Sequence, residues 1–170
     1  DASSANLYLN NFALAGTGTL TAPAAANAFQ VTSNWNRTGG TFNHNAAAVV
    51  FNGGDQTILG SNIFNTILKV APSGSSQTLT FQEGATQTAA TFLVRGTSPS
   101  HLRLRSRALG QFWNLSVASA PVVWLDVQDS NNTGPLINCT SNCTDSLNNI
   151  GWSFGNTLPT VTSRAQLITE

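Results

Sequence analysis

Apolar and polar residues alternate in short runs along most of this chain. The clearest runs are residues 78–81, 91–94, 102–105, 113–117 and 122–127. A period of two, carried by β-branched and aromatic residues, is typical of β-strands. The apolar spacing that marks an amphipathic helix is not sustained anywhere, and the alanine-rich pieces are too short to nucleate a helix. The pattern therefore predicts an all-β chain.

The strand-like runs recur at regular distances. Ile67, Phe92 and Leu115 lie in similar runs that are 25 and 23 residues apart. A second series, at residues 79–81 and 102–104 and then at Val122 to Trp124, advances by 23 and 20 residues. Two series that advance together are typical of a β-solenoid, in which each turn of the chain stacks its strands on the previous turn.

The alternative fold is a β-sandwich or jelly roll, because short strands that recur every 8–12 residues or so would also produce alternating runs. The turn residues favour the solenoid. Only Asn52-Gly53 has the form of a tight hairpin turn, whereas irregular corners of Asn, Ser, Thr and Gly are frequent. In a solenoid we expect the following side chains to point inward: Leu79, Phe81, Phe92, Leu102, Leu104, Leu115, Val117 and Val123.

Charged residues make up only 8% of the chain, and seven basic residues balance seven acidic ones. With no net charge, the chain lacks the attraction that draws proteins to nucleic acid or to anionic lipid, so neither is an expected partner. No apolar run reaches the roughly 18 residues of a membrane span, so the chain is not expected to span a membrane. The first residue is Asp1 rather than Met. This start predicts removal of a secretory signal peptide and an extracellular or cell-surface location.

The two cysteines, Cys139 and Cys143, enclose three residues in a turn-rich segment. Two thiols do not make a tetrahedral zinc site, and both histidines lie far away in the sequence. In an oxidising compartment these cysteines are expected to form a small disulfide loop. Free thiols and intermolecular bonds are the alternatives.

The sequence offers little for catalysis. Polysaccharide-degrading enzymes need cooperating carboxylates, and of the acidic residues only Asp126 and Asp129 are near neighbours. Asp129 opens a segment that is interpreted as a turn, and a calcium site with Asp126, Asp129 and Asp145 is the alternative. His44 and His101 have no acid nearby in the sequence and are interpreted as surface residues. No catalytic residue, cofactor or metal is expected.

Arginines form the one concentrated charge feature of the sequence. Arg103, Arg105 and Arg107 alternate with smaller or apolar residues, and Arg95 lies one strand earlier. Alternation places the three arginines on one face of a strand, opposite its leucines. One interpretation is a stripe that binds an anionic glycan or a neighbouring subunit. The other is a solvated face whose side-chain stems cover apolar surface.

Several segments resemble a recurring module of large secreted bacterial surface proteins of the adhesin type. The segments are FLVRGTS (92–98), LRLRS (102–106), QFWNLSV (111–117), VWLDVQDSN (123–131) and DSLNNIGWSF (145–154), with VFNG (50–53) and QTILGS (56–61) upstream. The resemblance covers about residues 31–154. It implies a right-handed parallel β-helix in that region and an extracellular structural or adhesive setting.

Two segments lie outside the resemblance: a strand-like arm or cap at residues 1–30 and a tail at residues 155–170. The arm is nearly uncharged, and its candidate assembly residues are Leu7, Tyr8, Leu9, Phe12, Leu14 and Leu20. The open ends of a β-helix need a cap or a partner. We therefore expect a non-enzymatic subunit of a surface filament or fibre, a homopolymer joined head to tail through terminal strands. The alternatives are an adhesin module that binds extracellular glycan and a polysaccharide-degrading β-helix enzyme.

Overall fold

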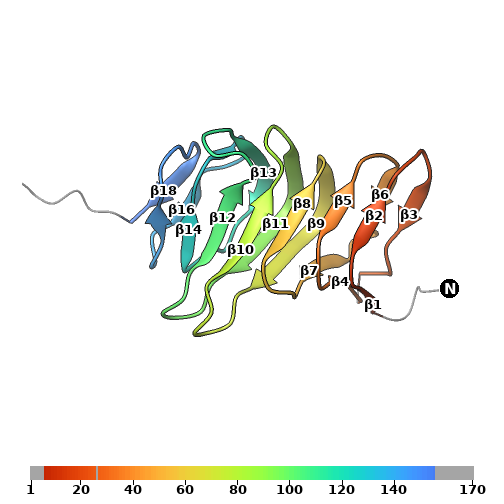
Figure 1. Ribbon diagram of the computed structural model, residues 1–170, viewed down its shortest axis with the longest axis horizontal. Helices are drawn as coiled ribbons and strands as arrows, with labels where there is room; N and C mark the ends of the chain where they lie inside the picture. Colours follow the sequence, from red (N-terminus) through yellow and green to blue (C-terminus); the bar gives the residue numbers. More distant parts are fainter. Residues whose placement is uncertain (1–5, 26, 156–170) are drawn as a thin grey trace, which may run out of the picture.

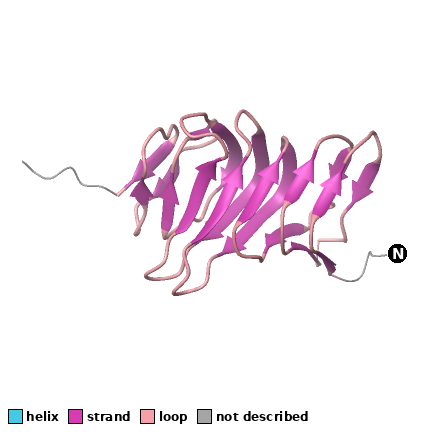
Figure 2. Cartoon of the chain, in the orientation of Figure 1, coloured by secondary structure: helices cyan, strands magenta, loops and turns pink. Residues whose placement is uncertain are grey.

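The computed structural model describes residues 6–25 and 27–155 of the 170-residue chain. Within this part, the regular elements are eighteen short strands joined by turns and loops, and no helix is present (Figure 2). The prediction of an all-β chain is confirmed. The described part contains no helix with the length and apolar character that a membrane crossing requires.

Most strands belong to two seven-stranded sheets, here called sheet I and sheet II, which run along the long axis of the molecule (Figure 1). In order, sheet I contains β1 (Leu7–Leu9), β4 (Ala28–Val31), β7 (Ala48–Phe51), β9 (Asn62–Val70), β11 (Thr86–Arg95), β13 (Trp113–Ser119) and β15 (Ser130–Asn132). Sheet II contains β2 (Phe12–Leu14), β5 (Trp35–Arg37), β8 (Gln56–Leu59), β10 (Gln77–Phe81), β12 (Leu102–Ser106), β14 (Leu125–Val127) and β17 (Thr144–Asp145). Two further pairs are β3 (Thr19–Thr21) with β6 (Thr41–Asn43), and β16 (Ile137–Cys139) with β18 (Trp152–Phe154).

All pairings between these strands are parallel. From β7 to β15 the chain alternates between the sheets, so that each strand pairs with the strand two places further along the sequence. Leu102, for example, lies beside Leu125, which follows it by 23 residues. A sandwich or jelly roll is built from antiparallel strands, so the parallel register contradicts that alternative.

The hydrophobic core lies between sheets I and II. Phe81 of sheet II stacks on Trp113 of sheet I with ring centroids 4.0 Å apart, and Phe29 of sheet I meets Trp35 of sheet II edge-on at 5.8 Å. Seven of the side chains expected to point inward are buried, as the alternation predicted: Leu79, Phe81, Phe92, Leu102, Leu104, Leu115 and Val117.

The eighth expected inward residue, Val123, is only half-buried, and this prediction is wrong. The cause is Trp124, whose φ of 55° is a left-handed conformation that interrupts a strand. The expected strand at residues 122–127 therefore begins only at Leu125, where the alternation starts again with Leu125 and Val127 buried.

The runs that contain Ile67, Phe92 and Leu115 do stack as neighbouring strands, β9, β11 and β13. Leu115 lies beside Gln87, because β11 is ten residues long and β13 pairs with it from Thr86 onward. Phe92 does lie beside Ile67, as the spacing predicted.

The segment expected to be an N-terminal arm continues the sheets instead of standing apart from them. Strands β1, β2 and β3 are the first members of their sheets and pair with β4, β5 and β6. Phe12 of this segment is buried in the core and stacks on Trp35 at 3.7 Å. Residues 1–5 of the expected arm and residues 156–170 of the expected tail lie outside the described residues.

Replacing Leu104 with alanine is expected to lower the free energy of unfolding by about 2–5 kcal/mol, because this fully buried side chain would leave a cavity. Urea unfolding measures the change. Leu109→Ala is the matched control, since Leu109 is 79% exposed, and its effect should stay within about 0.5 kcal/mol. Equal losses in the two variants would contradict the assigned register.

Candidate functional site

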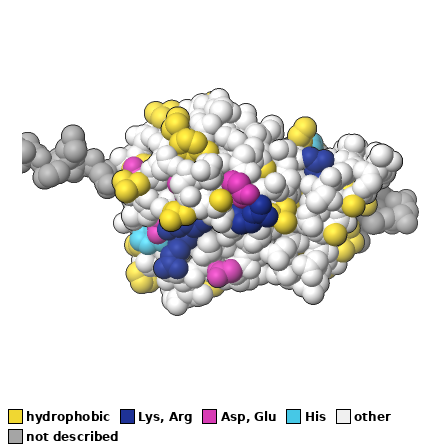
Figure 3. All heavy atoms as spheres, turned by 45° about the horizontal axis from the view of Figure 1, so that its top comes forward, with side chains coloured by type: hydrophobic (Ala, Val, Ile, Leu, Met, Phe, Trp, Pro, Cys, Tyr) yellow, Lys and Arg dark blue, Asp and Glu magenta, His cyan; other side chains and the backbone are white. Residues whose placement is uncertain are grey.

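The four arginines of the expected stripe lie on the outside of the sheets. Strand β12 turns Leu102 and Leu104 into the core, which leaves Arg103 and Arg105 on the outer face. Arg107 follows the end of β12, and Arg95 ends β11. On the face drawn in Figure 3, basic side chains gather in a few small groups on a surface that is otherwise mostly uncharged.

Two of these arginines have carboxylate partners on neighbouring strands or turns. Arg105 Nη2 lies 2.6 Å from Asp126 Oδ2, and its Nη1 donates to the Asp126 carbonyl at 2.6 Å. Arg107 donates to both carboxylate oxygens of Glu83, at 2.5 and 3.0 Å. These hydrogen bonds lower the pKa of Glu83 and raise that of Arg107. The first pair joins β12 to β14, and the second joins the segments that follow β12 and β10, so half of the stripe is explained as structural.

The other two arginines have no ion-pair or hydrogen-bonding partner for their side chains among the described residues. Arg95 and Arg103 are both exposed. Near them, the ring of Trp124 lies 5.3 Å from the ring of His101, tilted by 54°. Both residues are half-buried. The stripe therefore divides into a paired half and a free half, and the backbone of Trp124 hydrogen-bonds to the residues next to both free arginines.

The remaining tryptophans are engaged elsewhere. Trp35 and Trp113 are fully buried in the core. Trp152 is half-buried and stacks on Phe154 at 5.9 Å, near the C-terminal end of the described chain. Trp124 is half-buried, and its carbonyl accepts from Gly96 and Leu102, the residues next to the two unpaired arginines.

Lys69, the single lysine of the chain, is a buried charged residue that sequence reasoning missed. Its Nζ donates to the carbonyl oxygens of Gly53 and Gly54, at 2.9 and 2.8 Å, and to Gln56 Oε1 at 2.9 Å. Burial lowers the pKa of its amino group from 10.5 to about 8, while the Asp55 carboxylate acts in the opposite direction. Strand alternation could have indicated this burial, because Lys69 shares a strand face with the buried Ile67 two residues earlier. We interpret Lys69 as a structural donor that holds the turn before β8.

The three aspartates of the calcium alternative are bound to separate partners. Asp126 accepts from Ser146 Oγ at 2.6 Å in addition to its pair with Arg105. Asp129 accepts from Gly110 N and from Asn148 Nδ2, and Asp145 accepts from two groups of its own turn. Within residues 6–25 and 27–155, no three His, Cys, Asp or Glu side chains lie close enough together to hold a metal ion.

The histidines lie in different places. His44 is half-buried in a turn, where its Nδ1 accepts from the Ala46 amide at 3.0 Å. His101 precedes β12 and contacts Trp124. The two histidines therefore have different partners, at the end of β6 and before β12.

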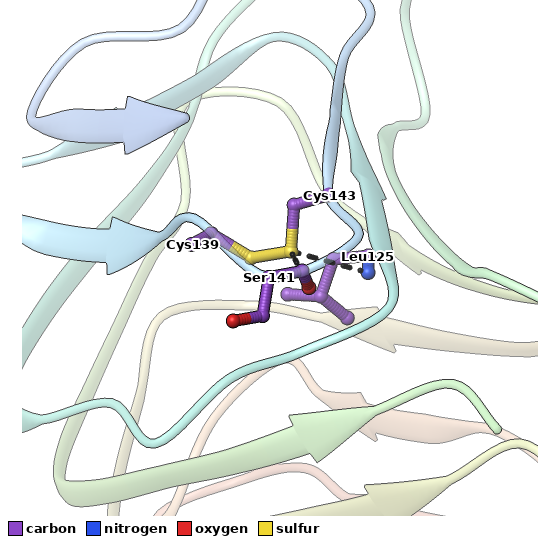
Figure 4. The surroundings of a disulfide bond; sticks show 4 residues. All are labelled: Leu125, Cys139, Ser141 and Cys143. Atoms are coloured by element: carbon purple, nitrogen blue, oxygen red, sulfur yellow. Dashed lines mark hydrogen bonds between the residues drawn. A yellow bond between two sulfur atoms is a disulfide. The ribbon is translucent and has the colours of Figure 1, made fainter. Parts of the chain in front are cut away.

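Cys139 and Cys143 are joined by a disulfide with an S–S distance of 1.99 Å and a Cα–Cα distance of 5.7 Å (Figure 4). The loop that they close lies against the start of β14. The Leu125 amide donates to Cys143 Sγ at 3.5 Å, and the Trp124 amide donates to the Ser141 carbonyl at 3.3 Å. The loop thus helps to hold the unusual backbone of Trp124.

Comparisons of the chain with protein-family models, with curated proteins and with solved structures found no match.

The stability of the protein is expected to rise with pH across the interval between the two pKa values of Lys69. The unfolded chain, with a pKa near 10.5, binds more protons there than the folded chain, with a pKa of about 8, so raising the pH favours folding. We expect a gain of roughly 2 kcal/mol, measured by urea unfolding at several pH values. Lys69→Met should be less stable and should lack this rise. A flat profile for the unmodified protein would contradict the assignment.

Reduction of the disulfide is expected to lower the free energy of unfolding by about 2 kcal/mol, because the closed loop is short. Intact-mass measurement without reductant should show a deficit of two hydrogens. The double variant Cys139→Ser with Cys143→Ser should match the reduced protein in stability. Two titratable thiols in the oxidised protein, or a dimer that reduction dissociates, would contradict the pairing.

Proposed function

We propose that the chain is a right-handed parallel β-helix that serves as a non-enzymatic structural subunit of an extracellular surface filament, joined head to tail through terminal strands. One observation carries this proposal. Among the described residues, the outer edges of β1, β2 and β3 at one end and of β17 and β18 at the other pair with no further strand.

The alternation of the chain between sheets I and II supports the β-helix. Strands of sheet I and sheet II follow one another in sequence from β7 to β15, and each pairs in parallel with the strand two places on. Crossovers between parallel strands are right-handed in about 98% of cases, which supports the handedness.

At the N-terminal end, β1, β2 and β3 each pair on one side only within the part of the chain that the structure describes. An open strand edge presents N–H and C=O groups that can pair with a strand of another chain. The side chains Leu7, Leu9, Leu14 and Leu20 contact the core there but remain half-exposed. This end therefore offers both hydrogen-bonding groups and apolar surface to a partner.

At the opposite end, too, the described residues leave strand edges without a further strand and apolar side chains exposed. Strands β17 and β18 are the last members of their sheets, and the two ends lie at opposite extremes of the long axis (Figure 1). Trp152 and Phe154 are half-buried there, while Leu147 and Ile150 are 74% and 52% exposed. Because the two ends differ, a contact between them is heterologous and can repeat without closing a ring. The balanced charge of the chain removes repulsion between copies.

The remaining parts of the proposal have weaker but independent support. A disulfide is stable in oxidising compartments and is rare in the cytosol, which favours an extracellular location. Glycoside hydrolysis needs two carboxylates that flank one bond. Asp126, Asp129 and Asp145 instead have separate structural partners, which favours a non-enzymatic role over the polysaccharide-degrading alternative.

Tyr8→Pro is expected to block assembly without unfolding the chain. The Leu9 carbonyl accepts from Thr32 N of the neighbouring strand. Carbonyls alternate in direction along a strand, so the N–H and C=O of Tyr8 face the open edge. Proline there removes only the outward N–H, which edge strands tolerate. We expect the unmodified protein to form particles that grow with concentration, measured by light scattering and negative-stain microscopy, and Tyr8→Pro to stay monomeric.

Tyr8→Thr is the matched control, because it removes the exposed ring but keeps the N–H, and it should assemble like the unmodified protein. Two results would overturn the proposal: polymers of Tyr8→Pro like those of the unmodified chain, or an unmodified chain that remains monomeric at high concentration.

A further inference from the structure

Most cationic side chains in the described part of the chain are paired. Arg37 donates to Asn62 and to the Gly40 carbonyl, and Lys69 donates to three acceptors. Arg105 and Arg107 bind carboxylates. Arg95 and Arg103 are the two Lys or Arg side chains without a hydrogen-bond or ion-pair partner among residues 6–25 and 27–155. In a chain with so few charges, this exception needs an explanation.

The two free arginines flank one corner of the fold. The Trp124 carbonyl accepts from Gly96 N at 3.2 Å and from Leu102 N at 3.0 Å. It therefore joins the residue after Arg95 to the residue before Arg103. A side chain at position 96 would not fit, because its Cβ would lie 2.5 Å from the Trp124 carbonyl oxygen. The close approach of these backbones places Trp124 between the end of β11, at Arg95, and the start of β12, next to Arg103.

The backbone of Trp124 is held in an unusual conformation. A φ of 55° is a true outlier for a bulky side chain, and such residues cluster at binding sites, where surrounding contacts maintain them. The Trp124 carbonyl has two donors, and its amide donates to the Ser141 carbonyl within the disulfide loop. These contacts keep the indole ring beside His101. Figure 3 shows one group of basic side chains next to a histidine, toward the left.

We propose that Arg95, His101, Arg103 and Trp124 form a binding site for an acidic polysaccharide. The two guanidinium groups bind carboxylates of uronic acid units, for which their planar donors are suited. The indole ring packs against the apolar face of a sugar ring.

The chemistry of the corner favours an anionic ligand that is rich in acceptors. The free polar groups of Arg95, Arg103 and Trp124 are N–H donors. The nearest carboxylate on the adjoining strand, that of Asp126, is already bound by Arg105 and Ser146. A nucleic acid is a poorer match, because a chain with no net charge supplies little of the phosphate attraction that dominates such binding.

The site is separate from the proposed assembly contacts. Strands β11 and β12 are interior members of sheets I and II, with neighbours on both sides. The corner between them therefore remains accessible when the ends of the sheets are joined. Binding of polysaccharide can succeed or fail independently of filament formation.

Binding of the full chain to immobilised polygalacturonate at low ionic strength tests the site, with neutral dextran as the reference surface. Arg95→Gln combined with Arg103→Gln should weaken binding at least about tenfold, since two charge-assisted contacts are lost. Trp124→Gly removes the ring at a position whose positive φ glycine adopts freely, and it should weaken binding severalfold. Arg107→Gln is the matched control for loss of charge, because Arg107 is paired with Glu83, and its affinity should stay within about twofold.

Circular dichroism and thermal melting establish that each variant is folded, and the exposed positions of Arg95 and Arg103 favour folding. Four results would overturn the proposal: no binding of polygalacturonate, equal binding of dextran, an Arg107→Gln loss as large as that of the double variant, or unchanged binding by Trp124→Gly. Binding of a sulfated polymer in place of polygalacturonate would also overturn the assignment to uronic acid.

Discussion

Two parallel strands cannot be joined by a tight turn, because the chain must travel back before it can pair again in the same direction. In this protein the return path runs through the opposite sheet, so Leu102 of β12 meets its partner Leu125 only after the chain has formed β13. Each strand is therefore held by residues about twenty positions away, and each crossing adds side chains to the core between the sheets. The fold, its open ends and the corner at Trp124 all follow from this requirement.

Because charged residues are scarce, most buried polar groups in this protein are paired with uncharged ones. Amides and backbone carbonyls satisfy buried polar groups that ion pairs would satisfy in a more charged protein: Asn62 donates to Gln87 at 2.9 Å on the neighbouring strand, and Trp35 donates to Asn62 at 2.8 Å. Lys69 can be buried because three oxygen atoms accept hydrogen bonds from its amino group. Where charges pair, as in Arg105 with Asp126, the pair joins adjacent strands. Unpaired cations at a corner of such a protein are therefore informative about ligands.

Strand alternation predicted much of the core correctly. Leu102 and Leu104 are fully buried because side chains two apart share a face of the sheet. The prediction failed at Val123, where the left-handed Trp124 interrupts the alternation. The residue that lies beside Leu115 could not be predicted, because it depends on where β13 starts along the longer β11. Of the candidate site, the outward direction of the arginines could be predicted. Which of them find partners could not, because the partners lie on other strands.

The sequence alone therefore determined the all-β class and the inward or outward direction of most strand residues, since these depend on local periodicity. The tertiary structure decided which strands pair, and with them the parallel arrangement, the role of Lys69 and the division between paired and free arginines. It also decided that residues 7–21 continue the sheets instead of forming a separate arm. The physical reason is that periodicity is a property of neighbours along the chain. Strand register, the burial of a charged side chain and a left-handed backbone conformation such as that of Trp124 depend instead on contacts between residues that are far apart in the sequence.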